Sequence, residues 1–270
     1  MRRIVRTAVP AAAAQYLARC QHAVDSGRAA GEVWKRARRT RSMQAVYDRL
    51  VEMVGPRSRC MFCLDSRGVD IDHFWPKSQY PERTFAWDNL MLVCAGCNRR
   101  KSDRFGLDTD GVPMLIDPTR DDPWDYLYYD SRTGILTARF APTGEPAARG
   151  FYTVESSNLP LNIQAVTDGR LRAQRNLERC IHRFLQSANA SNARDELVTE
   201  LRSCLDDNDD YGLRTWFVLR EGRDEGEFAE LRSRFPEVWT ELESFTAERE
   251  RSCRPTGSRH GRTQGNLNKR

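Results

Sequence analysis

The chain has 270 residues, and its 43 Lys and Arg against 38 Asp and Glu give a formal net charge of +5. A mean hydropathy of -0.69 and the lack of any apolar run long enough to cross a bilayer exclude a membrane-spanning protein. The charge is uneven, because both ends of the chain are basic and the stretch between residues 58 and 250 is acidic. Segregated positive charge suits contact with a phosphate backbone. The first residues are basic but lack an export segment, so we expect a cytoplasmic protein without a membrane partner.

Two helical segments are predicted before residue 57. Residues 11–25 follow Pro10 and favour a first helix, and a second follows the Gly/Ala-rich break at 27–31. This second helix begins with a basic run, continues into an amphipathic stretch with apolar residues at helical spacing, and ends at Gly55. We expect the basic run to contact DNA; a solvated face, or a surface that docks on an acidic partner, is the alternative. Its candidate residues are Lys35, Arg36, Arg38, Arg39 and Arg41.

Two Cys-x-x-Cys pairs follow, at Cys60/Cys63 and Cys94/Cys97. Four thiolates in two such turns fit one tetrahedral Zn(II) ion, and a closed four-thiolate site makes this zinc structural. The alternative is that these four cysteines are buried thiols or form a disulfide and bind no metal. The remaining cysteines show no paired spacing, and in a reducing compartment we expect them to be free thiols. They are Cys20, Cys180, Cys204 and Cys253.

The insert between the pairs carries the candidate catalytic groups. Alternating residues from Val69 predict a short strand that ends at His73, and the apolar run 90–93 predicts a second strand. A helix is expected to open near Asn98. Asp72 and Asn98 offer oxygen ligands to a hard divalent cation and leave room for water and a phosphate. A neutral His73 beside them can take a proton from the attacking water if a third group holds its ring.

Each of these residues also has a plainer interpretation. Asp72, Asn89 and Asn98 suit ordinary turns and helix caps. Lys77 and Lys101 are expected to contact phosphate, and the alternative for both is a solvated surface charge.

The predicted order is a strand, a loop, a second strand, the Cys94/Cys97 turn and a helix. This order resembles the HNH or ββα-metal nuclease family, and the resemblance is carried by three motifs: DIDH at 70–73, WDNLMLVC at 87–94 and CNRRK at 97–101. The third motif position is Asn98 rather than His, which matches the family's HNN variants and leaves the metal preference open. The resemblance implies a catalytic Mg(II) or Mn(II) ion held by Asp72 and Asn98, His73 as the general base and Asn89 as the group that orients His73.

A finer resemblance covers residues 55–180. The stretches HFWPKSQYP, W-x-NL, CxxCNxxK and LIDPTRDDP are similar to the HNH nucleases of Septu-type anti-phage defence systems, the PtuB group, and to retron-associated relatives. That resemblance implies an ABC-type, PtuA-like ATPase partner that holds or licenses the nuclease.

Beyond the insert, the sequence predicts a strand and turn at 115–118, then a hairpin of 124–129 and 135–140 with a Gly-containing loop. Helices are expected near an apolar stripe at 177–185 and at 193–205, 212–221 and 225–250. The acidic run 206–210 lacks the spacing of a calcium loop and favours a solvated connection. The last residues are basic and rich in Gly, which favours a disordered tail.

These features predict an α+β fold with a ββα-metal HNH nuclease core inside a four-cysteine zinc ribbon, flanked by N-terminal helices and a C-terminal helical region. We expect the division to be a basic helical segment at 1–57, the nuclease core at 58–110, a strand and hairpin extension at 111–160, the helical region at 161–250 and the tail at 251–270. The expected function is metal-dependent cleavage of nucleic acid, most simply DNA, in anti-phage defence. The first alternative is a non-catalytic zinc module that binds nucleic acid or a protein. The second alternative is a site-specific restriction or homing enzyme, although the sequence shows no module that would read a DNA sequence.

Overall fold

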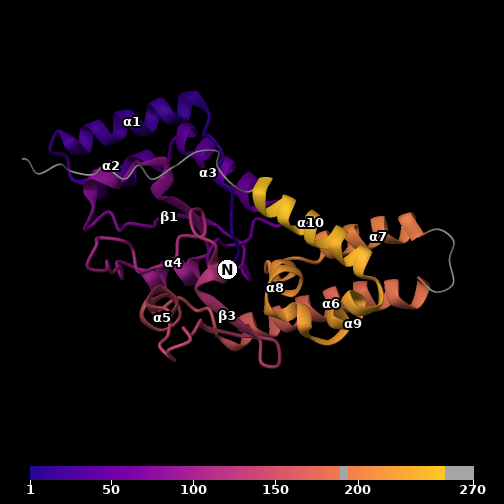
Figure 1. The fold of residues 1–270 in the computed structure, drawn as a ribbon. Helices are drawn as coiled ribbons and strands as arrows, with labels where there is room; N and C mark the ends of the chain where they lie inside the picture. The colour runs from indigo at the N-terminus through magenta and orange to yellow at the C-terminus, as the bar shows by residue number, and fades with distance from the viewer. Residues whose placement is uncertain (189–193, 253–270) are drawn as a thin grey trace, which may run out of the picture.

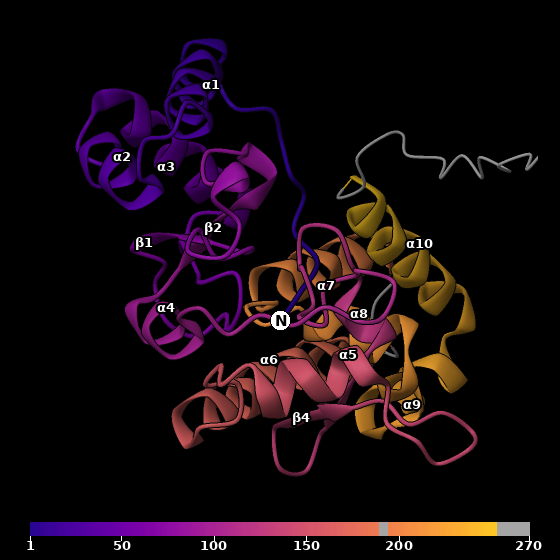
Figure 2. The same ribbon diagram turned by 90° about the vertical axis from the view of Figure 1, so that its left-hand side faces the viewer.

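The computed structural model describes residues 1–188 and 194–252, with side chains as far as residue 250. The secondary structure is mixed, with many helices and two small antiparallel sheets, so the predicted α+β class is confirmed. Helices α1 to α4 and the strands β1 and β2 lie on one side of the molecule, and helices α6 to α10 lie on the other (Figures 1 and 2). None of the described helices is long and apolar enough to span a membrane.

Three helices form the N-terminal part. Helix α1 covers Ala11–Asp25, as predicted, while α2 covers Ala30–Ala37 and α3 covers Arg41–Val54. The prediction of one continuous second helix is therefore wrong. The chain breaks because Thr40 caps α3, accepting a hydrogen bond from the backbone N–H of Met43. Helix α3 ends as predicted at Gly55, whose φ of 88° favours glycine.

The ββα unit follows the first cysteine pair. Strand β1, Asp70–His73, pairs antiparallel with β2, Leu90–Val93, so that His73 lies opposite Leu90. Helix α4 covers Ala95–Lys101 and so begins three residues earlier than predicted. It starts there because Cys94 serves as its cap, with Sγ accepting from the backbone N–H of Cys97 at 3.3 Å. Asn98 and Lys101 lie one turn apart on this helix, and both contact β1.

The segment after α4 is irregular before it reaches the second sheet. Of the strand and turn predicted at 115–118, the strand is wrong and the turn is present at 118–120, where Asp117 accepts from the N–H and the hydroxyl of Thr119, each at 2.8 Å. The predicted hairpin is confirmed as β3, Leu127–Asp130, paired with β4, Ile135–Ala138. Helix α5, Ala148–Phe151, follows and continues as a π-helical turn.

The C-terminal part is helical, as predicted. Its elements are α6 (Gln164–Ser187), α7 (Arg194–Asp207), α8 (Leu213–Leu219), α9 (Gly226–Arg234) and α10 (Pro236–Ser252). The helix expected over 225–250 is broken between α9 and α10, because a residue before proline avoids helical dihedrals and Phe235 lies at φ -135° and ψ 64°. Trp216 of α8 is fully buried and packs against Trp124 and Tyr128.

A disulfide corrects one prediction about the cysteines. Cys180 of α6 and Cys204 of α7 are joined, so they are not free thiols. Sequence spacing carried no signal for this bond, because it joins neighbouring helices over a separation of 24 residues. Cys20 is free, as expected. Cys253 and the basic tail lie outside the described residues.

Ion pairs and a hydrogen bond near the acidic run 206–210 connect the two sides of the molecule. Asp210 pairs with Arg57, and Tyr211 donates its hydroxyl proton to Asp65, beside the first cysteine pair, at 2.6 Å. Asp206 pairs with Arg214 and Arg249. The run is therefore not a freely solvated connection, because its carboxylates anchor the helical region and link it to the zinc-binding part of the chain.

Candidate active site and zinc centre

The four predicted zinc ligands come together. The sulfurs of Cys60, Cys63, Cys94 and Cys97 are buried and lie within 4.8 Å of one another. A tetrahedron with Zn–S bonds of about 2.3 Å places its sulfurs about 3.8 Å apart, and Cys63 and Cys94 are separated by 3.9 Å. The donor set therefore fits a structural Zn(II) ion.

A pocket of about 550 Å³ opens beside β1. It is lined by α2, by the turn between α2 and α3, by α3 itself, and by β1 and α4. Three predicted catalytic residues, Asp72, His73 and Asn98, share it with the predicted phosphate contacts Arg38, Arg39 and Lys77. Elements far apart in the sequence thus supply one site.

His73 is held in a defined orientation. Its Nε2 lies 3.0 Å from the carbonyl oxygen of Thr84, and its ring packs edge-on against Trp34 at a centroid distance of 4.3 Å. Burial lowers the pKa of His73 to about 3, so the ring is neutral at physiological pH. Since a neutral imidazole carries one N–H, donation from Nε2 to the carbonyl leaves Nδ1 as a proton acceptor.

Asp72 is a buried carboxylate with an incomplete set of partners. Its Oδ2 lies 3.3 Å from the Lys101 ammonium, yet this ion pair lacks the geometry of a hydrogen bond. Burial raises the pKa of Asp72, and the charge of Lys101 opposes that shift. An acceptor oxygen that is buried and incompletely bonded suits a cation ligand.

Lys101 cannot contact phosphate, and that prediction is wrong. The residue is fully buried, and its ammonium donates to the carbonyl oxygen of His73 at 2.8 Å. The physical reason is that Lys101 lies one turn after Asn98 on the face of α4 that contacts β1, which places its ammonium next to Asp72. Lys101 therefore balances charge within the site instead of offering charge to a substrate.

Asn98 brings in a carboxylate that the sequence interpretation missed. Its side-chain amide donates to Asp70 at 3.2 Å, which leaves its amide oxygen available to a cation. Asp70 lines the same pocket as Asp72, because residues two apart in a strand share a face. This period-two signal was present in the sequence DIDH. Asp70, Asp72 and Asn98 together offer the oxygen donors that a hard divalent cation prefers.

Asn89 fixes the loop between β1 and β2 and does not contact the His73 ring. Its side-chain oxygen accepts from the N–H of Trp75 at 2.7 Å, and its amide donates to the carbonyls of Trp75 and Arg83. This loop carries Thr84, whose carbonyl holds His73. The direct orienting group is thus a backbone oxygen, which no side-chain pattern reveals, and the role of Asn89 becomes indirect.

Arginines 38 and 39 lie in the turn that separates α2 from α3 and are exposed. Neither they nor Lys77 has an ion pair within the described part of the chain. The other predicted nucleic-acid contacts, Lys35, Arg36 and Arg41, are also exposed but do not line the pocket. The pocket thus combines neutral His73, oxygen donors and three uncompensated cations.

The buried ion pair gives a stability prediction. Replacing Lys101 by methionine leaves the buried Asp72 carboxylate without its counter-charge, and we expect the free energy of unfolding to fall by about 3 kcal/mol. Arg100→Met on the exposed side of the same helix is the matched control, with an expected change below about 0.5 kcal/mol. Urea denaturation at neutral pH measures both. Equal stability of the two variants would show that the pair contributes nothing.

Comparisons with known proteins agree with this geometry. Residues 60–104 match the HNH endonuclease family. Septu protein PtuB from Bacillus thuringiensis is 31% identical over 86 residues, which cover 30% of this chain and 32% of that protein. The chain thus spans about a third of the length of this curated relative. No solved structure matches the chain. The resemblance to the HNH endonucleases is thus confirmed over residues 60–104, which contain the cysteine pairs and the ββα unit, and the resemblance to Septu protein PtuB is confirmed over 86 residues.

Proposed function

We propose that the protein is a divalent-metal-dependent endonuclease that hydrolyses phosphodiester bonds of DNA, as the nuclease component of a prokaryotic anti-phage defence system. The observation that carries the proposal is the shared pocket, in which His73, the oxygen donors and exposed arginines meet. The HNH match over residues 60–104 supports the nuclease, and the likeness to Septu protein PtuB supports the defence role.

In this proposal His73 is the general base. The Thr84 carbonyl and the Trp34 ring hold the imidazole, so Nδ1 can take the proton of an attacking water without reorientation. Asp72, Asn98 and the neighbouring Asp70 hold the catalytic ion. When bound, a Mg(II) or Mn(II) ion stabilises the negative charge that develops on the scissile phosphate and the leaving oxygen.

The basic turn beside the pocket gives a binding prediction. We expect the double variant Arg38→Ala and Arg39→Ala to bind DNA about tenfold or more weakly and to show a smaller salt dependence, because two phosphate contacts are lost. Arg132→Ala is the control, since Arg132 is exposed on the β3–β4 turn and its side chain pairs with Asp130. Fluorescence anisotropy at several salt concentrations provides the comparison. Unchanged affinity and salt slope would place the DNA elsewhere.

The neutral state of His73 gives a pH prediction. A base whose pKa is lowered from 6.5 to about 3 stays deprotonated as the medium becomes acidic, so its proton-accepting form persists. We expect metal-saturated, single-turnover cleavage to continue from pH 8 to about pH 5.5, without a fall centred on the ordinary histidine pKa. An acid limb with its midpoint near 6.5 would mean that His73 titrates as an exposed histidine and is not held as proposed.

We also propose that the nuclease works with an ABC-type, PtuA-like ATPase partner, which rests on the similarity to Septu protein PtuB alone. Affinity purification of the tagged chain from its native host should recover such an ATPase in a stable complex. Recovery of the chain alone, under conditions that keep it folded and zinc-bound, would count against the partner.

The alternative function, a non-catalytic zinc module, can be tested with the same protein. A module that only binds has no need of a neutral, oriented His73 beside Asp70, Asp72 and Asn98. The convergence of these groups therefore supports the nuclease, and cleavage assays separate the two functions.

A further inference from the structure

A second, larger pocket of about 940 Å³ lies next to the segment that carries His73. His73 lines the catalytic pocket, whereas the next two residues, Phe74 and Trp75, line the larger one. The sequence interpretation did not identify this pocket, because its walls come from the N-terminal segment, the β1–β2 loop, residues 112–121 and α5. We propose that it binds the phosphate group of an organic phosphate of nucleotide size.

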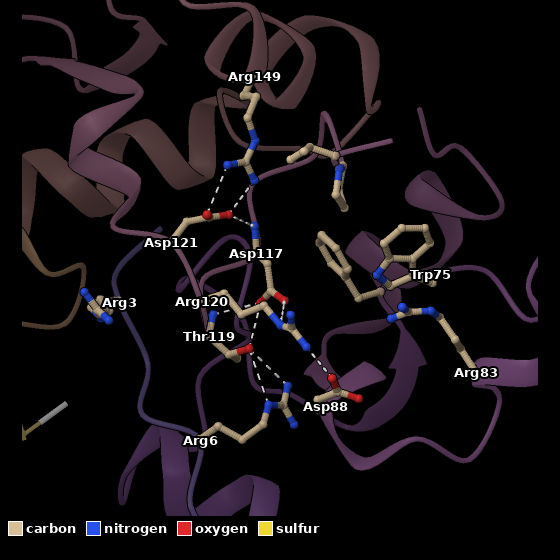
Figure 3. Close-up of a pocket in the computed structure, with 13 residues that line it drawn as sticks. Arg3, Arg6, Trp75, Arg83, Asp88, Asp117, Thr119, Arg120, Asp121 and Arg149 are labelled. Atoms are coloured by element: carbon tan, nitrogen blue, oxygen red, sulfur yellow. Dashed lines mark hydrogen bonds and ion pairs between the residues drawn. The ribbon is translucent and has the colours of Figure 1, made fainter. Parts of the chain in front are cut away.

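Arginines stand on several sides of the pocket (Figure 3). The pocket is lined by five of them and by three aspartates, so positive charge is in excess. The five arginines are Arg3, Arg6, Arg83, Arg120 and Arg149, and the aspartates are Asp88, Asp117 and Asp121.

The aspartates do not repel an anion, because each is already engaged. Asp121 accepts two hydrogen bonds from the guanidinium of Arg149, at 2.5 and 3.0 Å. Asp88 pairs with Arg120, as the dashed lines in Figure 3 show. Asp117 lies 3.7 Å from the same Arg120, and one of its oxygens accepts from Thr119. Arg120 and Arg149 thus pair with all three carboxylates and offset two of their three negative charges, so the lining as a whole keeps an excess of two positive charges.

The other three arginines have no carboxylate partner within hydrogen-bond reach in the described part of the chain. Arg3 has neither a hydrogen bond nor an ion pair there, although its Nε is buried. Arg83 lies over the ring of Trp75, 4.4 Å from the centroid. Arg6 donates only to neutral acceptors, including the carbonyl of Trp87 at 2.7 Å.

Three cations without a carboxylate partner within hydrogen-bond reach surround one hollow, and an anion that enters it would offset the net positive charge of the lining. Burial lowers the pKa of Arg6, and the charges of Asp117 and Asp88 oppose that shift. A phosphate offers several oxygens to guanidinium groups in geometry that favours bidentate contacts. The arrangement of Arg3, Arg6 and Arg83 therefore favours a phosphate ligand.

The apolar lining favours an organic phosphate over a free inorganic ion. Phe74, Trp75, Val112 and Pro113 contribute to the wall, and the volume lies in the range of small-molecule sites. The Trp75 ring packs against Arg83 and against Phe105, so it is already in contact with other groups and is not arranged to stack a base. Recognition would thus depend on the phosphate and on shape, and the phosphate can belong to a free nucleotide or to a nucleic-acid strand.

Isothermal titration of the full chain, without added divalent metal, tests the proposal with pyrophosphate, ATP and a 5′-phosphorylated thymidine tetranucleotide. We expect binding to the wild-type chain that is weakened about tenfold or more by Arg3→Ala and by Arg83→Gln. Arg132→Ala, outside the residues that line the pocket, should bind pyrophosphate and ATP as the wild type does. Circular dichroism establishes that each variant is folded.

Competition then distinguishes the two sources of phosphate. Displacement of ATP by the tetranucleotide assigns the pocket to a nucleic-acid strand, and independent binding assigns it to a free nucleotide. The proposal is overturned if the wild-type chain binds none of the three probes, or if folded Arg3→Ala and Arg83→Gln variants bind as the wild type does. Because the readout is binding, it is independent of whether the protein cleaves DNA.

Discussion

Replacing His73 by alanine is expected to lower the rate of DNA cleavage at least about a hundredfold, because a positioned general base contributes that much to a hydrolytic reaction. The zinc content and the far-ultraviolet circular dichroism should not change, since the ring contacts Trp34 and the Thr84 carbonyl but no cysteine. Cleavage of supercoiled plasmid in the presence of Mn(II) measures the rate.

A matched control separates loss of the base from loss of packing. His22 lies at the C-terminal end of α1, outside the residues that line the catalytic pocket, and His22→Ala should cleave as the wild type does. His73→Gln keeps much of the volume against Trp34 but cannot act as a base, so it should be as inactive as His73→Ala. Full cleavage by either His73 variant would remove this residue from the mechanism.

Replacing Cys97 by serine is expected to abolish zinc binding and to unfold the region around residues 60–104. Zinc binding is coupled to folding in such sites, so weakening the zinc site by the loss of one of its four thiolates also destabilises the fold around it. The backbone N–H of Cys97 also donates to the Cys94 sulfur at the start of α4, so the helix that carries Asn98 and Lys101 depends on the Cys94/Cys97 turn. Metal analysis and limited proteolysis report the two effects.

Cys20→Ser is the control, because Cys20 is a free thiol of α1 outside the cluster. It should retain one zinc per chain and its resistance to protease. A Cys97→Ser protein that is soluble, free of zinc and still active would show that the cluster is not the structural support of the nuclease site.

The sequence was sufficient for the elements whose signals are local. The bounds of α1 and β2 follow from Pro10 and from the apolar run after Asn89, and both match the structure. The cysteine pairs likewise specified their own cluster, because two short turns with fixed spacing leave one way to satisfy a tetrahedral ion. Asp72, His73 and Asn98 were placed in one pocket from motif order alone, although their catalytic roles remain a proposal.

The features that the sequence could not specify depend on tertiary contacts. Lys101 looked like a surface charge, and only the register between α4 and β1 buries it against Asp72. The Thr84 carbonyl and the Trp34 ring that hold His73 come from a loop and a helix with no motif of their own. The break before α3 does have a local signal in the sequence, because Thr40, within the basic run, is a residue type that favours the helix N-cap.

The larger pocket illustrates the same limit. Its uncompensated arginines, Arg3, Arg6 and Arg83, are far apart in the sequence, and nothing in the chain distinguishes them from the many other arginines. Pairing distinguishes them, because Arg120 and Arg149 form the ion pairs with the three aspartates of the pocket and the other three arginines do not. Such a charge balance becomes visible only in three dimensions.

The most direct test of the account is cleavage of plasmid and single-stranded DNA by the purified, zinc-loaded chain, alone and co-expressed with the proposed ATPase partner. The account predicts cleavage that requires Mg(II) or Mn(II), stops when the ion is chelated and returns when it is restored. A folded chain with one zinc that cuts neither substrate under any of these conditions would contradict the nuclease and favour a zinc module that only binds.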